Sequence, residues 1–322
     1  MASLDFLHKD AETKLCEHYI AGGAVCRLST NSEEVIDAAR DTFLLTKDSR
    51  DSADFSIRCW VDRAGYAVPP WPKPYVRGLD HLVFASFDEG SSMLADLRTR
   101  RLIGRLSAAM AADRAYCRTV IFPMLLTIIG ASVGIAELHC ACVAREENGV
   151  LLAGASSSGK STLALALSQQ GFGFLSDDRT FCSLENGQVQ AWGLPTRLKL
   201  RPEATLWFQD LRRQPPPVTS SGNADLWFEP ERLTGVKRAR QCRPTALIFL
   251  ERLDGARFGL SPLTSAEALG RLDRDLIAEF SVAAARRYET LRKVAEIPCW
   301  SLQYGGEPQR VAQKISRHLA RL

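Results

Sequence analysis

The stretch Gly154-Ala155-Ser156-Ser157-Ser158-Gly159-Lys160-Ser161 matches the pattern G-x-x-x-x-G-K-[ST] at every fixed position. The short apolar run before it, residues 149–153, is typical of a buried strand. The run after it, residues 162–170, is rich in helix formers and stops at Gly171. Strand, glycine-containing loop and helix in this order favour a phosphate-binding loop over a small-residue turn with a chance lysine. The stretch therefore predicts an α/β fold with a nucleoside triphosphate site.

Each residue type in this loop has a physical task. Backbone N–H groups at the glycines and the positive end of the helix dipole attract phosphate oxygens. Lys160 is predicted to contact the β- and γ-phosphates, and the Ser161 hydroxyl to ligate Mg²⁺. ATP and Mg²⁺ are thus the expected cofactors. The predicted nucleotide contacts are Gly154, Ser156, Ser158, Gly159, Lys160, Ser161 and Thr162.

The composition bears on the number of domains, on the expected partners and on the cellular location. A length of 322 residues predicts about two domains, and a net charge of +4 is too mild to indicate a nucleic-acid partner. Nine cysteines occur without a C-x-x-C pair, and Cys140 and Cys142 alternate on an expected strand as buried free thiols rather than zinc ligands. The odd cysteine count and the lack of a recognisable signal peptide predict a cytoplasmic protein.

One apolar segment must be weighed against the predicted cytoplasmic location, because it could instead span a membrane. Residues 119–136 are nearly uncharged and long enough to span a bilayer. Pro123, Gly130 and Gly134 lower the insertion propensity, and the segment continues directly into Glu137 and an expected strand. A helix buried in a protein core is therefore the favoured interpretation, and no membrane partner is expected.

The first third of the chain is predicted to be mainly β. Short alternating runs at 55–61 and 82–85 indicate strands. Residues 92–113 have a helical composition, with four arginines interpreted as a solvated face. From about residue 135 the pattern becomes strand, loop, helix, strand. We therefore expect a small α+β domain over 1–134 and a nucleotide-binding domain over 135–322.

The second domain continues with a buried strand at 246–250 and two expected helices, around 264–281 and 307–321. Between them and the loop lies the stretch 212–223, which contains three consecutive prolines. It is predicted to be either a surface connection or a mobile lid over the nucleotide site.

An acidic pair follows the loop by one helix. The apolar run 172–176 ends in Asp177-Asp178, and consecutive side chains of an extended segment point to opposite sides. One carboxylate could face Mg²⁺ while the other accepts a proton from an attacking hydroxyl. The alternatives are an Asp-Asp turn that caps the next segment, and Glu251 after the strand at 246–250 as the metal ligand. His139, fifteen residues before Gly154, would by itself be read as structural.

The spacing of His139, the loop 154–161 and Asp177-Asp178 resembles the catalytic domain of HPr kinase/phosphorylase. That family phosphorylates a serine of a small carrier protein, and its fold is related to the nucleotide-binding domain of phosphoenolpyruvate carboxykinase. The resemblance implies that Asp177 is the general base and Asp178 a metal-site carboxylate beside Ser161. It also implies that His139 and Lys160 take part in catalysis.

The chain also departs from that family. The family usually has glycine at the position of Ser157, and its bifunctional members usually have glutamate at the position of Thr162. The segment linked to phosphorolysis is not recognisable around 193–197, so the likeness gives no basis for expecting the reverse reaction. The chain is most similar to divergent HPr-kinase-like proteins, some of which modify peptides in natural-product pathways.

The resemblance implies a serine or other alcohol of a protein or peptide as the phosphate acceptor, with the N-terminal domain as a docking unit. Related kinases are oligomers, so self-association is a further expected interaction. A P-loop ATPase, a nucleotide-dependent switch and a binding-only module are the alternatives. Six basic residues are candidates either to hold the acceptor or to form solvated surface: Arg197, Lys199, Arg201, Lys237, Arg238 and Arg240.

Overall fold

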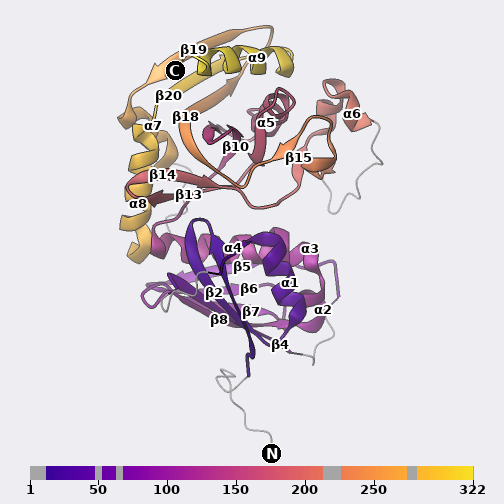
Figure 1. Ribbon diagram of the computed structural model, residues 1–322, viewed down its shortest axis with the longest axis vertical. Helices are drawn as coiled ribbons and strands as arrows, with labels where there is room; N and C mark the ends of the chain where they lie inside the picture. The colour runs from indigo at the N-terminus through magenta and orange to yellow at the C-terminus, as the bar shows by residue number, and fades with distance from the viewer. Residues whose placement is uncertain (1–11, 48–52, 63–67, 213–225, 274–280, 322) are drawn as a thin grey trace, which may run out of the picture. The chain divides into compact units, whose positions relative to one another are not determined.

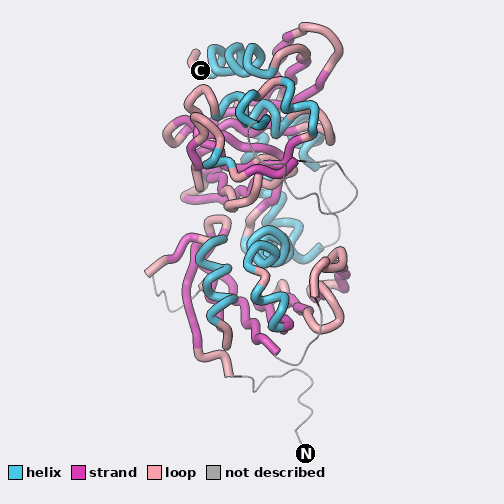
Figure 2. The backbone as a smooth tube through the Cα atoms, turned by 90° about the vertical axis from the view of Figure 1, so that its right-hand side faces the viewer, coloured by secondary structure: helices cyan, strands magenta, loops and turns pink. Residues whose placement is uncertain are grey.

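The computed structural model describes residues 12–47, 53–62, 68–212, 226–273 and 281–321. The chain divides into two compact units, and both mix strands with helices (Figures 1 and 2). The first unit takes in the described residues of Met1–Gly134 and Ile277–Arg287, and the second those of Ile135–Leu276 and Tyr288–Leu322. The fold is therefore mixed α/β, built on two large sheets.

The first unit is built on an eight-stranded sheet in the order β3-β1-β2-β4-β8-β7-β6-β5. Its strands are β1 (Leu15–Ala21), β2 (Ala24–Thr30), β3 (Leu44–Leu45), β4 (Phe55–Asp62), β5 (Tyr75–Leu79), β6 (Leu82–Ser86), β7 (Ser92–Asp96) and β8 (Arg101–Ser107). Its helical segments are α1 (Glu33–Thr42), α2 (Ala108–Ala112), α3 (Arg114–Tyr116), η1 (Cys117–Ile121), α4 (Phe122–Gly130) and η2 (Ala131–Val133). Alternate strand residues are buried and α1, α2 and α4 pack against the sheet, so one face carries the core.

The helix predicted over 92–113 is wrong, because most of this segment forms the hairpin of β7 and β8. Alanine, leucine and arginine favour a helix locally, but the buried residues recur with period two: Met93 and Ala95 on one strand, Leu102 and Leu106 on the other. Gly104 must be glycine here, since a Cβ would lie 2.2 Å from the Ser92 carbonyl oxygen. Sheet pairing therefore outweighs helix propensity.

The apolar segment 119–136 contains the helix α4, as expected. Residues Arg114–Val133 form a helix long and apolar enough to cross a membrane by composition, and 61% of its most apolar window is buried within the protein. Phe122, Leu125 and Ile129 are among the buried residues. This burial agrees with the prediction of a core helix.

The second unit is built on a ten-stranded sheet in the order β17-β12-β10-β11-β18-β14-β13-β9, with β20 beside the later part of β18 and β19 beside β20. A separate pair, β15 and β16, completes its strands. The strands are β9 (Ala136–Leu138), β10 (Cys140–Arg145), β11 (Asn148–Ala153), β12 (Gly173–Ser176), β13 (Thr180–Glu185), β14 (Gln188–Trp192), β15 (Leu198–Leu200), β16 (Leu226–Phe228), β17 (Lys237–Arg238), β18 (Gln241–Arg252), β19 (Phe258–Leu263) and β20 (Cys299–Tyr304).

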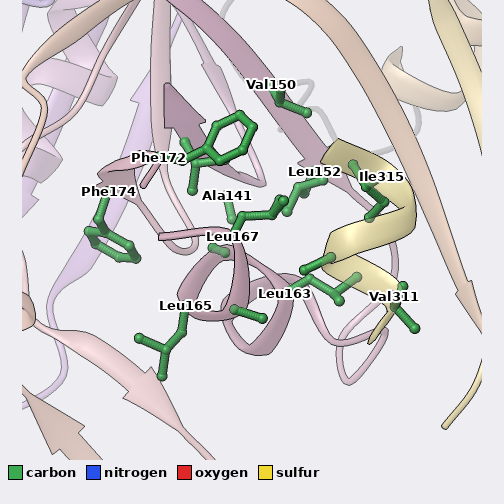
Figure 3. Close-up of a cluster of buried hydrophobic side chains, with 14 of the residues drawn as sticks. Ala141, Val150, Leu152, Leu163, Leu165, Leu167, Phe172, Phe174, Val311 and Ile315 are labelled. Carbon is green, nitrogen blue, oxygen red and sulfur yellow. The ribbon is translucent and has the colours of Figure 1, made fainter. Parts of the chain in front are cut away.

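Helices cover this sheet on both sides. They are α5 (Lys160–Ser168), η3 (Pro202–Leu206), α6 (Gln209–Arg212), η4 (Pro230–Arg232), α7 (Ser265–Asp273), α8 (Ser281–Glu296) and α9 (Pro308–Leu319). On one face Leu163 and Leu167 of α5 and Val311 and Ile315 of α9 pack on Leu152 (Figure 3). On the other face α7 and the end of α8 cover Cys142, Leu151 and Leu247. The strands are therefore apolar on both faces, as a central sheet requires.

The C-terminal helices differ in part from the expectation. The helix predicted at 307–321 is α9, and the start of the helix predicted at 264–281 is α7. Residues 274–280 lie outside the described residues, and α8 was not predicted at all. The stretch 212–223, apart from Arg212, also lies outside them. The expected strand at 246–250 is the centre of β18.

Candidate functional site

The loop 154–161 joins β11 to α5, and its conformation explains its two glycines. Gly154 has φ +148°, and a Cβ there would lie 2.8 Å from the Leu250 carbonyl oxygen. Gly159 has φ +92° and caps α5, and a Cβ there would lie 2.0 Å from the Tyr304 hydroxyl oxygen. Ser157 takes φ +70° without being glycine. Backbone geometry and close contact thus both require glycine at 154 and 159.

Tyr304 fixes this loop from the neighbouring strand. Its hydroxyl donates to the Ser158 carbonyl oxygen at 2.6 Å, and burial raises the pKa of Tyr304 to about 12, so the hydroxyl keeps its proton at neutral pH. The contact joins residues 146 positions apart, because β20 pairs with β18 beside β11. No local pattern marks Tyr304 in the sequence, and the sequence analysis did not single it out.

Lys160 points back over the loop and is almost wholly buried. Its Nζ donates to the Gly154 carbonyl oxygen at 2.7 Å and to that of Ala155 at 3.3 Å, and lies 3.1 Å from His139 Nε2. On the far side of the imidazole, His139 Nδ1 lies 3.1 Å from Asp178 Oδ1. Since a lysine ammonium can only donate, His139 accepts at Nε2 and carries its proton at Nδ1, toward Asp178.

The two carboxylates after β12 occupy opposite environments. Asp177 is 5% exposed, and its Oδ2 accepts a hydrogen bond from the Lys199 backbone N–H at 2.8 Å. Burial is the main cause that raises the pKa of Asp177 to about 7; the Lys199 N–H lowers it and the neighbouring Asp178 adds to the increase. The side chain of Asp178 is 56% exposed and faces His139. Neighbouring residues therefore supply one carboxyl group that can exchange a proton near neutral pH and one solvated carboxylate.

These groups line one cavity of about 640 Å³. Ser156, Ser161 and Thr162 of the loop region line it, and so do Gly159, Lys160, His139, Asp177 and Asp178. Three more cations reach it, Lys199, Arg201 and Arg252, together with the exposed ring of Trp207. Arg201 Nη2 also donates to the Ser157 hydroxyl oxygen at 2.5 Å. A concave, cation-rich cavity with a buried carboxyl group suits an anionic ligand.

Other predicted residues lie elsewhere. Arg197 pairs with Glu229 at 2.8 Å, Arg238 pairs with Glu231, and Lys237 is exposed on β17, and these three cations are not among the lining residues. Gly154 and Ser158 are part of the loop but do not line the cavity. Glu251, the alternative metal ligand, is exposed and accepts from Gln303 Nε2 at 2.9 Å. Arg252 and Trp207, which do line the cavity, were not predicted from the sequence.

A second cavity, of about 680 Å³, lies around Arg145, Phe172 and Pro298. None of the predicted site residues lines it. Its lining is mostly apolar with few titratable groups.

The buried Asp177 predicts a pH dependence of stability. The folded state keeps a proton up to about pH 7 that the unfolded state loses above the ordinary pKa of 3.8, so the free energy of unfolding should fall as the pH rises between these values. Asp177→Asn cannot ionise, so it should be more stable than the wild type at pH 8 by on the order of 4 kcal/mol and about equal near pH 4. Urea unfolding in EDTA, without nucleotide, measures this difference. If the free energy of unfolding changed in parallel with pH in the two proteins, the raised pKa of Asp177 would be refuted.

Comparison with known proteins finds similarity among solved structures. No family model and no curated protein matches the chain. Among solved structures, the chain is similar to the Hpr(Ser) kinase/phosphatase from Coxiella burnetii, with a TM-score of 0.32 and 15% sequence identity. The match covers 57% of this chain and 91% of that chain.

Proposed function

We propose that this chain is a phosphotransferase that moves the γ-phosphate of ATP to a serine or other alcohol hydroxyl of a protein or peptide. The observation that carries the proposal is the position of Asp177. This buried carboxyl group, with a pKa near 7, lines the same cavity as Lys160 and the loop 154–161. A donor site for phosphates and a proton acceptor for a hydroxyl thus share one cavity.

The residues present fit a nucleotide with its metal ion. Ser161 at the start of α5 and the solvated carboxylate of Asp178 both line the cavity and offer the oxygen ligands that Mg²⁺ prefers. When bound there, Mg²⁺ would neutralise charge on the phosphate oxygens. Within the described residues no group of three or more His, Cys, Asp or Glu side chains could hold a metal ion.

The protein groups have separate tasks in this mechanism. Asp177 accepts the proton of the acceptor hydroxyl as the hydroxyl oxygen attacks the γ-phosphorus; the bond from that phosphorus to the oxygen it shares with the β-phosphate breaks, and ADP leaves. In the structure Lys160 Nζ is hydrogen-bonded to two loop carbonyl oxygens and lies beside His139. With ATP bound, it donates to phosphate oxygens and stabilises the negative charge that develops on them. His139 accepts from Lys160 and faces Asp178, so it orients both. Arg201 and Arg252 supply further positive charge around the cavity.

Mass spectrometry tests the proposal directly. The purified protein is incubated with ATP, Mg²⁺ and a synthetic library of peptides that each carry one serine, and the products are compared with those of Asp177→Asn. A gain of one phosphate on a subset of peptides, absent with the variant, is the expected result. Release of ADP at equal rates with and without peptides, with no phosphopeptide formed, would show an ATPase instead.

A further inference from the structure

The eight-stranded sheet of the first unit has one covered and one open face. Along β6 and β7 the buried residues Val83, Ala85, Met93 and Ala95 alternate with exposed or half-buried ones, and β4 and β8 follow the same pattern over most of their length. The buried set faces the core of the unit. Among the described residues, most of the other set is in contact with solvent, and Trp60 of β4 is the buried apolar exception along these four strands. We call this second set the open sheet face.

Arginines dominate the charge of the open sheet face. Strand register and alternation place five of them on it, against the two carboxylates Asp62 and Asp96. Arg105 lies 3.8 Å from Asp62, and Asp96 is paired with Arg101 across the strands. Counted over the strand residues that the structure describes, the face therefore has a net positive charge. Its arginines are Arg27, Arg58, Arg77, Arg101 and Arg105.

Apolar side chains lie between these arginines. One row of directly paired residues crosses five strands in the order Arg77, Phe84, Leu94, Ile103, Arg58. Three apolar side chains are thus bracketed by a cation at each end. Adjacent strands are spaced by about 4.8 Å, so the two arginines stand roughly 19 Å apart, about the length of six extended residues.

The apolar part of the face is unusually exposed for a folded domain. The ring of Phe84 is 44% exposed, and Leu79, paired with Leu82 on the edge hairpin, is 78% exposed. Tyr75 on the same strand is 59% exposed. Contiguous exposed apolar side chains of this kind mark interaction surfaces. The edge strand β5 pairs with β6 alone among the described strands, so one edge of the face is also open to pairing.

We propose that the open sheet face docks a polypeptide segment in which apolar residues are flanked by acidic ones, and that this segment belongs to the phosphate acceptor. The second half of this statement rests on the proposed function. Carboxylates at both ends of the segment complement Arg58 and Arg77, while its centre covers Phe84, Leu94 and Ile103. Docking away from the cavity would hold the acceptor on the enzyme and raise the local concentration of its hydroxyl.

The chemistry of the face favours a polypeptide over a nucleic acid. Single-stranded nucleic acids stack their bases on aromatic platforms, whereas two of the three central side chains, Leu94 and Ile103, are aliphatic. An apolar segment with acidic flanks meets both the aliphatic centre and the cationic ends.

Fluorescence anisotropy tests the docking without ATP or catalysis. The probe is a labelled peptide with three leucines flanked on each side by two glutamates. Arg58→Glu/Arg77→Glu should weaken its binding at least tenfold, and the milder Arg58→Gln/Arg77→Gln pair should weaken it less. Phe84→Ser should also weaken it. The matched control, Arg310→Glu/Arg317→Glu on the exposed side of α9, should bind within about twofold of the wild type.

Several outcomes would overturn the docking proposal. The first is that Arg58→Glu/Arg77→Glu binds the probe as tightly as the wild type does. The second is that the wild type binds a lysine-flanked peptide as tightly as the probe. The third is that the wild type binds a uridine oligonucleotide or phosphatidylserine vesicles more tightly than the probe, and that this binding is lost in Arg58→Glu/Arg77→Glu. Circular dichroism checks that each variant is folded. The ATPase rate of the double variants should match the wild type, because the arginines lie outside the cavity. Binding of the probe, together with no phosphorylation of any serine peptide in the library, would leave the docking of such a segment intact and would refute both the kinase and the assignment of the segment to its acceptor.

Discussion

Asp177→Asn is expected to lower phosphoryl transfer by about 10²–10⁴-fold, the range that a positioned general base contributes. The amide keeps the size of the side chain and can still accept from the Lys199 N–H, so the loop and the cavity should stay intact. ATP affinity should therefore change less than about threefold, and the loss should fall almost wholly on kcat. Single-turnover phosphorylation with ATP in excess, together with calorimetric titration of ATP, separates these quantities.

Glu251→Gln is the matched control for this loss. Glu251 is an exposed carboxylate at the end of β18 outside the residues that line the cavity, so its variant should retain the wild-type rate. Wild-type turnover by Asp177→Asn would show that Asp177 is not the base. A loss in Glu251→Gln equal to that in Asp177→Asn would move the acidic role to β18.

Lys160→Ala is expected to weaken ATP binding by at least tenfold and to lower transfer by a further factor of about 10²–10³, because its ammonium stabilises charge on the transferred phosphate. In the wild type the buried Lys160 Nζ donates to carbonyl oxygens of the loop 154–161, so the ammonium lies beside the loop that is proposed to bind the phosphates. Titration with a fluorescent ATP analogue and single-turnover rates measure the two effects.

Removing a buried lysine could also loosen the loop. The unfolding temperature of Lys160→Ala and the comparison with Lys237→Ala, an exposed lysine on β17, distinguish a local from a global effect. The control should behave as the wild type. ATP affinity unchanged in Lys160→Ala would refute the assignment of residues 154–161 as the phosphate-binding loop.

Much of the second unit follows from local sequence. The strand before Gly154, the helix from Lys160 and the buried strand at 246–250 all occur where their patterns predict them. These segments are strongly apolar or strongly periodic, so local pattern and tertiary packing agree. The segment 92–113 shows the opposite case, since helix-forming residues there form two strands that pair with each other, with the preceding strand β6 and with β4 earlier in the chain.

In the candidate site, too, some residues could be predicted from the sequence and others could not. The spacing of His139, Lys160 and the acidic pair drew attention to residues that the structure brings together in one chain of contacts from Lys160 through His139 to Asp178. Arg197 and Arg238 were equally plausible by charge, but each pairs with a glutamate outside the lining of the cavity. Charge alone cannot show which partner a side chain will find.

By itself, the sequence determined the loop, the glycines at 154 and 159, and the adjacency of two carboxylates, because these depend on the conformations of a few consecutive residues. Only the tertiary structure decided that Asp177 is buried and Asp178 solvated, that Tyr304 holds the loop and that Arg252 reaches the cavity. Those properties come from pairing between strands that lie about 50 to 96 residues apart in the sequence. Burial, which raises the pKa of Asp177 from 3.8 to about 7, is set by everything packed around the carboxyl group.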